Sequence, residues 1–132
     1  MARLTYKEIQ DDVVNKYRII LCDGSKCNND WSRMHAHVTR RTVCKWKQKS
    51  SVTATFDLLH EIGHIETRTS KMRRCEEEYA ATRWAISEAA KYWISVPDSI
   101  IIGYQEYIDD EHDRGVRRGG NLPPLEQFQL VV

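Results

Sequence analysis

Two histidines and a glutamate fall within five consecutive residues, as His60, Glu61 and His64. An α-helix has about 3.6 residues per turn, so side chains four apart share a face and both imidazoles can reach one metal ion. Glu61 lies one step round the same helix, where it can take a proton from a water in the ion's open position. The spacing H-E-x-x-H therefore predicts a zinc site with a general base beside it, which is the arrangement of a metal-assisted hydrolase.

The residues around this motif have a helical pattern. Within 55–66, the apolar residues Leu58, Ile62 and Ile65 fall on the side roughly opposite the two histidines. We expect one face to meet a hydrophobic core and the other to meet the metal. The alternative, two histidines on a solvated helix surface, predicts polar neighbours, whereas these neighbours are mostly apolar.

A third ligand is expected, because a catalytic zinc normally has three from the protein. A second helical stretch, 75–93, opens with three carboxylates, Glu76, Glu77 and Glu78. Glu78 alone shares its face with a stripe of small side chains, which allow two helices to approach closely: Ala81, Thr82, Ala85 and Ala89. Glu78 is the predicted ligand, with Glu77 as second choice. Acidic residues in a first turn also complement the helix dipole, and we assign that role to Glu76 and Glu77.

These two stretches carry a family resemblance. Residues 56–65, followed by Glu78-x-x-Ala81-Thr82-x-Trp84-Ala85, resemble the ImmA/IrrE group of small gluzincin metallopeptidases. In that family the second helix has the form Glu-x-x-Ala-(Asn, Asp or Ser)-x-Phe-Ala, and its Glu is the third zinc ligand. Thr82 and Trp84 depart from this pattern. The resemblance covers roughly residues 50 to 110.

The resemblance implies a zincin-like fold in which Zn²⁺ is held by His60, His64 and Glu78, with Glu61 as the base. Thr82 and Asp57 are candidates to support the ligands by hydrogen bonds. The implied activity is hydrolysis of a peptide bond in a protein substrate. By analogy with the family, a helix-turn-helix repressor of a phage or mobile element is a possible substrate.

Length and composition favour one domain spanning residues 1–132. The chain has 132 residues, 41% of them hydrophobic, which suits a single modest core. Its formal charge of +1 gives no global field to attract nucleic acid or membrane. No segment is apolar for the length of a membrane span, and the first residues lack the apolar stretch of a signal peptide. We therefore expect a cytoplasmic protein.

The chain is expected to have an α+β fold with a small antiparallel sheet packed on three or four helices. Periodicity predicts a helix over 5–16, a strand over 17–22 and β segments within 34–46, before the central helix that carries the motif. A further core helix is predicted over 100–111. The core is expected to span about 5–111, with 112–132 as an extended tail.

Four cysteines are expected to remain thiols: Cys22, Cys27, Cys44 and Cys75. Cys22 and Cys27 could hold a second, structural metal, although two unrelated thiols flanking a turn is the favoured interpretation. Cys75 could approach the metal, but a small, partly buried side chain is favoured.

Several polar residues have open roles. His35 and His37 alternate with apolar residues on a predicted edge strand, where they could contact an extended substrate, and we favour solvated side chains. Tyr104, Tyr107 and His112 could each stabilise an oxyanion, and the sequence does not select among them.

Two rival functional classes remain. One is a non-catalytic protein-binding module with a structural zinc site. The other is a nucleic-acid-associated protein that contacts phosphates through a basic run, although such a run is more often a solvated face: Arg40, Arg41, Lys45, Lys47 and Lys49.

Overall fold

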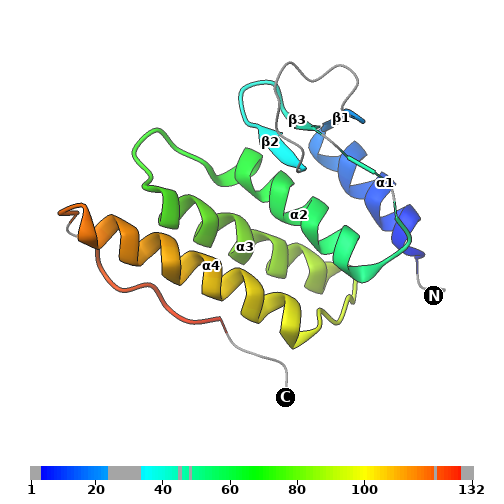
Figure 1. Ribbon diagram of the computed structural model, residues 1–132. Coiled ribbons are helices and arrows are strands. Elements are labelled where there is room, and N and C mark those ends of the chain that lie inside the picture. The colour runs from blue at the N-terminus through cyan, green and yellow to red at the C-terminus, as the bar shows by residue number, and fades with distance from the viewer. Residues whose placement is uncertain (1–3, 24–33, 45, 48, 121, 129–132) are drawn as a thin grey trace.

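A computed structural model describes residues 4–23, 34–44, 46–47, 49–120 and 122–128 (Figure 1). Within these ranges there are four helices and one three-stranded sheet, which confirms the expected α+β class. In chain order the elements are α1 (Tyr6–Tyr17), β1 (Ile20–Leu21), β2 (His35–His37), β3 (Thr42–Cys44), α2 (Val52–Thr67), α3 (Arg74–Lys91) and α4 (Asp98–Arg117).

The first two helices begin at side-chain caps. Thr5 and Glu8 form a capping box, in which each side chain accepts a hydrogen bond from the other's backbone N–H, at 3.1 and 3.0 Å. Ser51 caps α2 by accepting from the Ala54 N–H at 3.1 Å. Arg18, with φ of 54°, ends α1 in the left-handed region and turns the chain into β1.

The sheet has the order β1-β3-β2 and is mixed, whereas a small antiparallel sheet was expected. β2 and β3 form the expected antiparallel pair, with His35 opposite Cys44. β1 instead pairs in parallel with β3, matching Ile20 to Thr42. β3 is the central strand of the sheet. One of its edges pairs with β2 in the hairpin, and its other edge pairs with β1.

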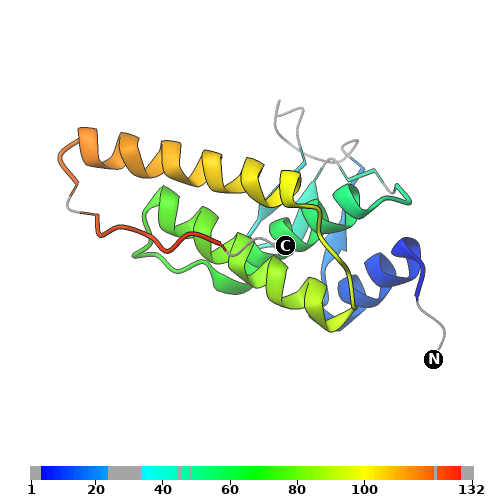
Figure 2. The same ribbon diagram turned by 90° about the horizontal axis from the view of Figure 1, so that it is seen from below.

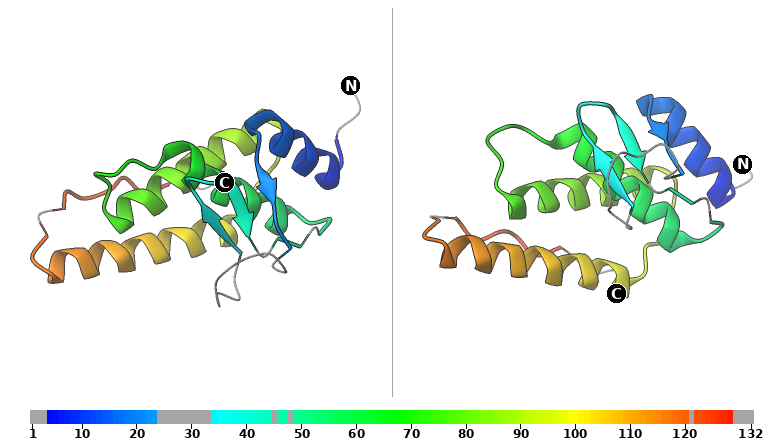
Figure 3. Two further views of the ribbon diagram at one scale, coloured as in Figure 1. Left: turned by 90° about the horizontal axis from the view of Figure 1, so that it is seen from above. Right: turned by 45° about the horizontal axis from the view of Figure 1, so that its top comes forward.

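Helix α2 lies at the centre of the molecule. The sheet and α1 lie on one side of it and α3 on the other, with α4 packed against α3 (Figure 1; Figure 3, right). The core gathers apolar side chains from all these layers, including Val13, Val43, Phe56, Leu59, Ile62, Ala85 and Ile101. The helix with the two-histidine motif is therefore the central one, as expected.

Helix α4 extends to Arg117, beyond the expected end near residue 111, so residues 112–117 are helical rather than part of a tail. A glycine at position 115 is tolerated, and the helix stops only where Gly119 takes a φ of 85°. The segment 122–128 then runs back along the helices (Figure 2). The Phe128 ring stacks on Tyr79, with centroids 5.0 Å apart, so this segment is docked.

The helices are amphipathic rather than apolar throughout. In α4 the buried residues are Ile101, Gln105 and Ile108, while most others face solvent. Among the helices of the described residues, none combines the length and apolar character required to cross a bilayer.

Candidate metal centre

Helices α2 and α3 approach each other closely at Gly63. A Cβ placed on Gly63 would lie 2.5 Å from the backbone oxygen of Ala81, so no larger residue fits without moving a helix. The stripe of small residues predicted on α3 lines this contact, and its members are at most 1% exposed: Ala81, Thr82, Ala85 and Ala89. The close approach allows a carboxylate on α3 to reach side chains on α2.

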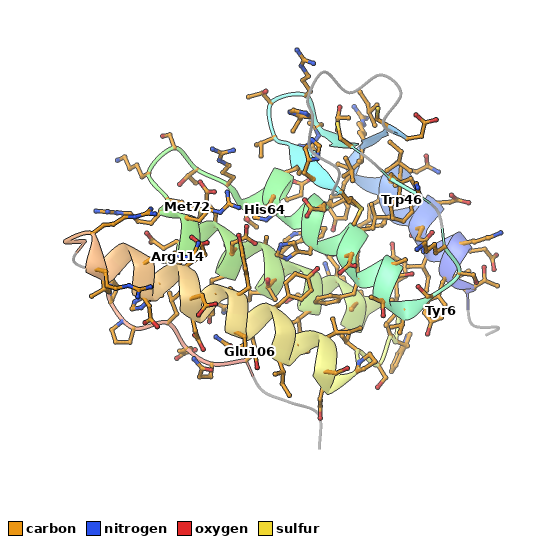
Figure 4. The ribbon with its side chains drawn as sticks, viewed as in Figure 1. Tyr6, Trp46, His64, Met72, Glu106 and Arg114 are labelled. Carbon is orange, nitrogen blue, oxygen red and sulfur yellow. The ribbon has the colours of Figure 1, made fainter. Side chains whose placement is uncertain are left out.

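The two histidines of the motif meet Glu78 across this contact. Glu78 Oε2 lies 3.0 Å from His60 Nε2 and 3.3 Å from His64 Nε2. The two Nε2 atoms are themselves 3.1 Å apart. In Figure 4, His64 stands between α2 and the first half of α3. Ligand atoms around a tetrahedral zinc ion lie about 3.4 Å apart, so the carboxylate oxygen and the two Nε2 atoms would need to move only slightly further apart to bind zinc.

Thr82 fixes the orientation of His60. Its hydroxyl donates to the Glu78 carbonyl oxygen at 2.8 Å and lies 3.0 Å from His60 Nδ1. Because the hydroxyl proton is already used, Thr82 accepts a hydrogen bond from a protonated Nδ1. Burial lowers the pKa of His60, which favours the neutral ring. His60 Nε2 is then unprotonated and directs its lone pair toward Glu78, as the nitrogen of a metal ligand must be able to do.

The remaining two ligand candidates are electrostatically coupled. Burial would lower the pKa of His64, but the hydrogen bond and charge of Glu78 raise it above its ordinary value. Burial would likewise raise the pKa of Glu78, but the hydrogen bond and charge of His64 hold it well below its ordinary value. Glu78 is therefore an anion at neutral pH, buried to 7% exposure and in need of a positive partner.

Glu61 lies beside the donor triangle. Three possible ligand atoms lie within 4.8 Å of one another: one carboxylate oxygen of Glu61 and one ring nitrogen each of His60 and His64. The Glu61 side chain is partly exposed, so solvent can reach its carboxylate. Burial raises the pKa of Glu61 to about 7, which suits a group that accepts and returns a proton near neutral pH.

The other two carboxylates of α3 point elsewhere. Glu76 accepts a hydrogen bond from the Arg73 backbone N–H at 3.1 Å, as a first-turn residue does. Glu77 forms an ion pair with Arg68 at 3.2 Å. The structure thus brings Glu78, and not the second choice Glu77, to the histidines.

Asp57 acts on the site through Tyr104. The Tyr104 hydroxyl donates to Asp57 Oδ1 at 2.5 Å, and its ring lies against His60 with centroids 4.4 Å apart. Burial and the Asp57 charge raise the pKa of Tyr104. Asp57 therefore holds a tyrosine ring that confines His60, while Thr82 contacts this histidine directly.

The sequence interpretation missed Arg74. Its guanidinium lies 3.7 Å from Glu78 Oε1 and donates to the Tyr107 hydroxyl at 3.1 Å. Tyr107 is thereby placed near the rim of the site, whereas His112 bonds the Pro123 carbonyl oxygen at 2.9 Å. The i, i+4 spacing of Arg74 and Glu78 was the available signal.

Other residues named from the sequence are placed as follows. His35 is 8% exposed, so the favoured solvated interpretation is wrong for it, while His37 is half-buried. Among the described residues, Cys22, Cys44 and Cys75 form no disulfide bond, and Cys75 is only 2% exposed.

Two of the named positions, Cys27 and Lys45, lie outside the described residues. In the basic run, Arg41 pairs with Glu66 and donates to the Tyr17 carbonyl oxygen at 2.6 Å. At least one cation of this run is therefore engaged within the protein.

Comparisons with known proteins add no relative: no family model matches the chain, and neither the curated proteins nor the solved structures give a match. The interpretation of this site therefore depends on its own geometry.

Proposed function

We propose that the protein is a zinc-dependent peptidase with a zincin-like fold. His60, His64 and Glu78 would hold the ion, and Glu61 would act as the general base. The convergence of Nε2 of both histidines on Glu78 Oε2, within 3.0 to 3.3 Å, carries this proposal. The resemblance of the two helices to ImmA/IrrE metallopeptidases supports it.

The protonation states favour a cation at this point. His60 has its proton on Nδ1, so its Nε2 lone pair faces a carboxylate and a second imidazole. A single proton on His64 Nε2 can form a hydrogen bond with only part of this group. A divalent cation instead accepts electron pairs from the two Nε2 atoms and the Glu78 oxygen at once. Two nitrogens and one carboxylate oxygen are also a donor set that zinc accepts in catalytic sites.

The residues around the donors have separate roles in hydrolysis. When bound, zinc supplies Lewis acidity toward water and toward a scissile carbonyl oxygen. Glu61 would accept a proton from the attacking water and return it to the leaving amine, for which a pKa close to neutrality is suitable. Thr82 and Tyr104 would keep His60 oriented, and Arg74 would keep Glu78 in place. Tyr107 would be the candidate hydroxyl to donate to a developing oxyanion, because the Tyr104 hydroxyl already donates to Asp57.

The substrate we propose is a peptide in an extended conformation within a protein. β2 is an edge strand of the sheet and lies against α2, so a peptide could add to it by backbone hydrogen bonds. A helix-turn-helix repressor is the substrate suggested by the family resemblance.

The decisive experiment compares Glu61→Gln with Glu78→Gln. Zinc content and cleavage of a repressor or unstructured protein substrate would be measured on both. We expect Glu61→Gln to keep zinc and lose at least about a hundredfold in rate, since a general base contributes on that order. Glu78→Gln should lose both cleavage and the zinc of this site, measured as one equivalent fewer than in wild type. Glu77→Gln is the matched control and should keep both.

The opposite outcome supports the rival binding module. If wild type and Glu61→Gln both bind zinc at this site and neither cleaves any protein offered, the metal has a structural role and the peptidase proposal is wrong. If Glu61→Gln cleaves as fast as wild type, the base assignment is wrong. A zinc content of Glu78→Gln equal to that of wild type would exclude Glu78 as a ligand.

A further inference from the structure

A second cluster of metal-binding side chains lies on the sheet. Ligand atoms of His35, His37 and Cys44 all lie within 4.8 Å of one another. The register explains this, because His35 is directly opposite Cys44 and His37 is two residues along the same strand. The two imidazole rings meet edge to face, with centroids 5.1 Å apart. The cluster therefore comes from two hydrogen-bonded strands rather than from a mobile surface.

This cluster is on the opposite face of the sheet from the helices. Ala36 pairs with Val43, and both pack into the hydrophobic core between sheet and helices. Since successive residues of a strand point to opposite faces, His35, His37 and Cys44 project away from that core. The sheet thus separates this cluster from His60.

Burial at this outward position is unexpected for a simple surface strand. Cys44 is 2% exposed and His35 is 8% exposed. A thiol and two imidazoles are the ligands that zinc prefers, and donors about 3.5 Å apart surround a tetrahedral ion. Distances within 4.8 Å require only small side-chain rotations to reach that spacing.

We propose that His35, His37 and Cys44 form a second zinc site, with a structural role in holding β2 to β3. The strands are short, at three residues each, so their ladder has few hydrogen bonds to stabilise it. A metal bound only by the folded state would add its binding free energy to the stability of the hairpin. The fourth position would be taken by water or another donor.

Cobalt substitution provides a test that is specific to this site. Cys44 supplies a thiolate, whereas the donors of the α2–α3 site are nitrogen and oxygen, so only a Co²⁺ bound at the sheet gives a thiolate-to-cobalt charge-transfer band. We expect this band in the metal-exchanged wild type and its loss in Cys44→Ser. Cys75→Ser is the matched control, since Cys75 is equally buried at 2% exposure, and it should keep the band.

Two single histidine variants provide a second test, which does not require the substitution of a fully buried residue. His37→Gln should weaken cobalt binding at the sheet on the order of tenfold or more, while His112→Gln should leave it unchanged. The band should also persist in the double variant His60→Gln/His64→Gln. Zinc content should be two equivalents in wild type and one in Cys44→Ser.

A wild type without the band, or a band that survives both Cys44→Ser and His37→Gln, would overturn the second site. Loss of the band in His60→Gln/His64→Gln would place the thiolate at the other centre and also overturn it. Failure of the peptidase proposal is distinguishable, because it would remove cleavage and leave the band intact.

Discussion

Thr82 Oγ1 lies 3.0 Å from His60 Nδ1 while it donates to the carbonyl oxygen of Glu78, one turn back on the same helix. One hydroxyl therefore contacts two of the three residues that converge at the α2–α3 site. It fixes which nitrogen of His60 has the proton, and so which nitrogen can bind a metal. A threonine at this position orients the His60 imidazole without adding a charge.

Thr82→Val should weaken zinc binding on the order of 10- to 100-fold, because valine keeps the shape of threonine but leaves His60 Nδ1 without an acceptor. Competition with a chelator of known affinity would measure this. Thr82→Ser retains the hydroxyl and should bind zinc nearly as wild type does. Equal affinities of the valine and serine variants would show that the hydrogen bond does not orient His60.

Gly63→Ala should destabilise the protein by about 1–3 kcal/mol or more, although alanine is the better helix former. The added Cβ would lie 2.5 Å from the Ala81 oxygen and push α2 from α3. The control is Gly103→Ala on α4, where no atom lies within 4 Å of the new Cβ, and it should gain about 0.5–1 kcal/mol. Chemical denaturation of both variants provides the measurement. Two changes of the same sign would contradict the close helix contact.

Glu88 should make stability depend on pH. Burial would raise the pKa of Glu88, but Lys91, which donates to it at 2.6 Å, together with Tyr17 and Lys16 holds it below its ordinary value of 4.5. A carboxylate with a lowered folded-state pKa contributes stability above the unfolded pKa and loses it as the pH falls through the folded one.

Glu88→Gln should therefore be less stable than wild type at neutral pH, by about 1–3 kcal/mol. The difference should shrink as the pH falls below 4.5, which urea denaturation at several pH values can follow. Glu106→Gln, at an exposed position of α4, should show no such trend. A gap that stays constant with pH would exclude the ionised Glu88 as its source.

Phe128→Ala should lower stability by about 1–2 kcal/mol, since a half-buried ring stacked on Tyr79 is removed. The backbone N–H of Phe128 also donates to Gln105 Oε1 at 3.0 Å, so the segment is held at both ring and backbone. Thermal denaturation and limited proteolysis would detect its release. Glu126→Ala, at an exposed position of the same segment, is the control. If Phe128→Ala is as stable as this control, the segment is not docked.

The two helices of the α2–α3 site were predictable because their signals are local. Helical periodicity sorted Glu78 from Glu76 and Glu77, and the small-residue stripe predicted the close approach that Gly63 and Ala81 make. Thr82 was assigned a supporting role, and it contacts His60. The contact from Tyr104 could not be deduced, since it depends on how α4 crosses α2 and α3.

The sheet was less predictable, because pairing depends on residues distant in sequence. The antiparallel pairing of the two segments within 34–46 was predicted, whereas the parallel pairing of β1 with β3 was not. His35 was interpreted as solvated from alternation alone, and burial on the outer face has no local signature. The end of α4 was predicted too early because the stretch after residue 111 has no apolar periodicity, whereas the helix continues to Arg117 and Gly119 is the glycine with the positive φ.

All three donors of the α2–α3 site come from one stretch of chain, since His60, His64 and Glu78 belong to consecutive helices. Contacts between neighbours in sequence close small loops, which costs little entropy and favours early formation during folding. One helix–loop–helix unit therefore brings all three side chains together. Under the proposed function, variation in the strands and in α4 would change which peptides are accepted without altering the residues of the α2–α3 site.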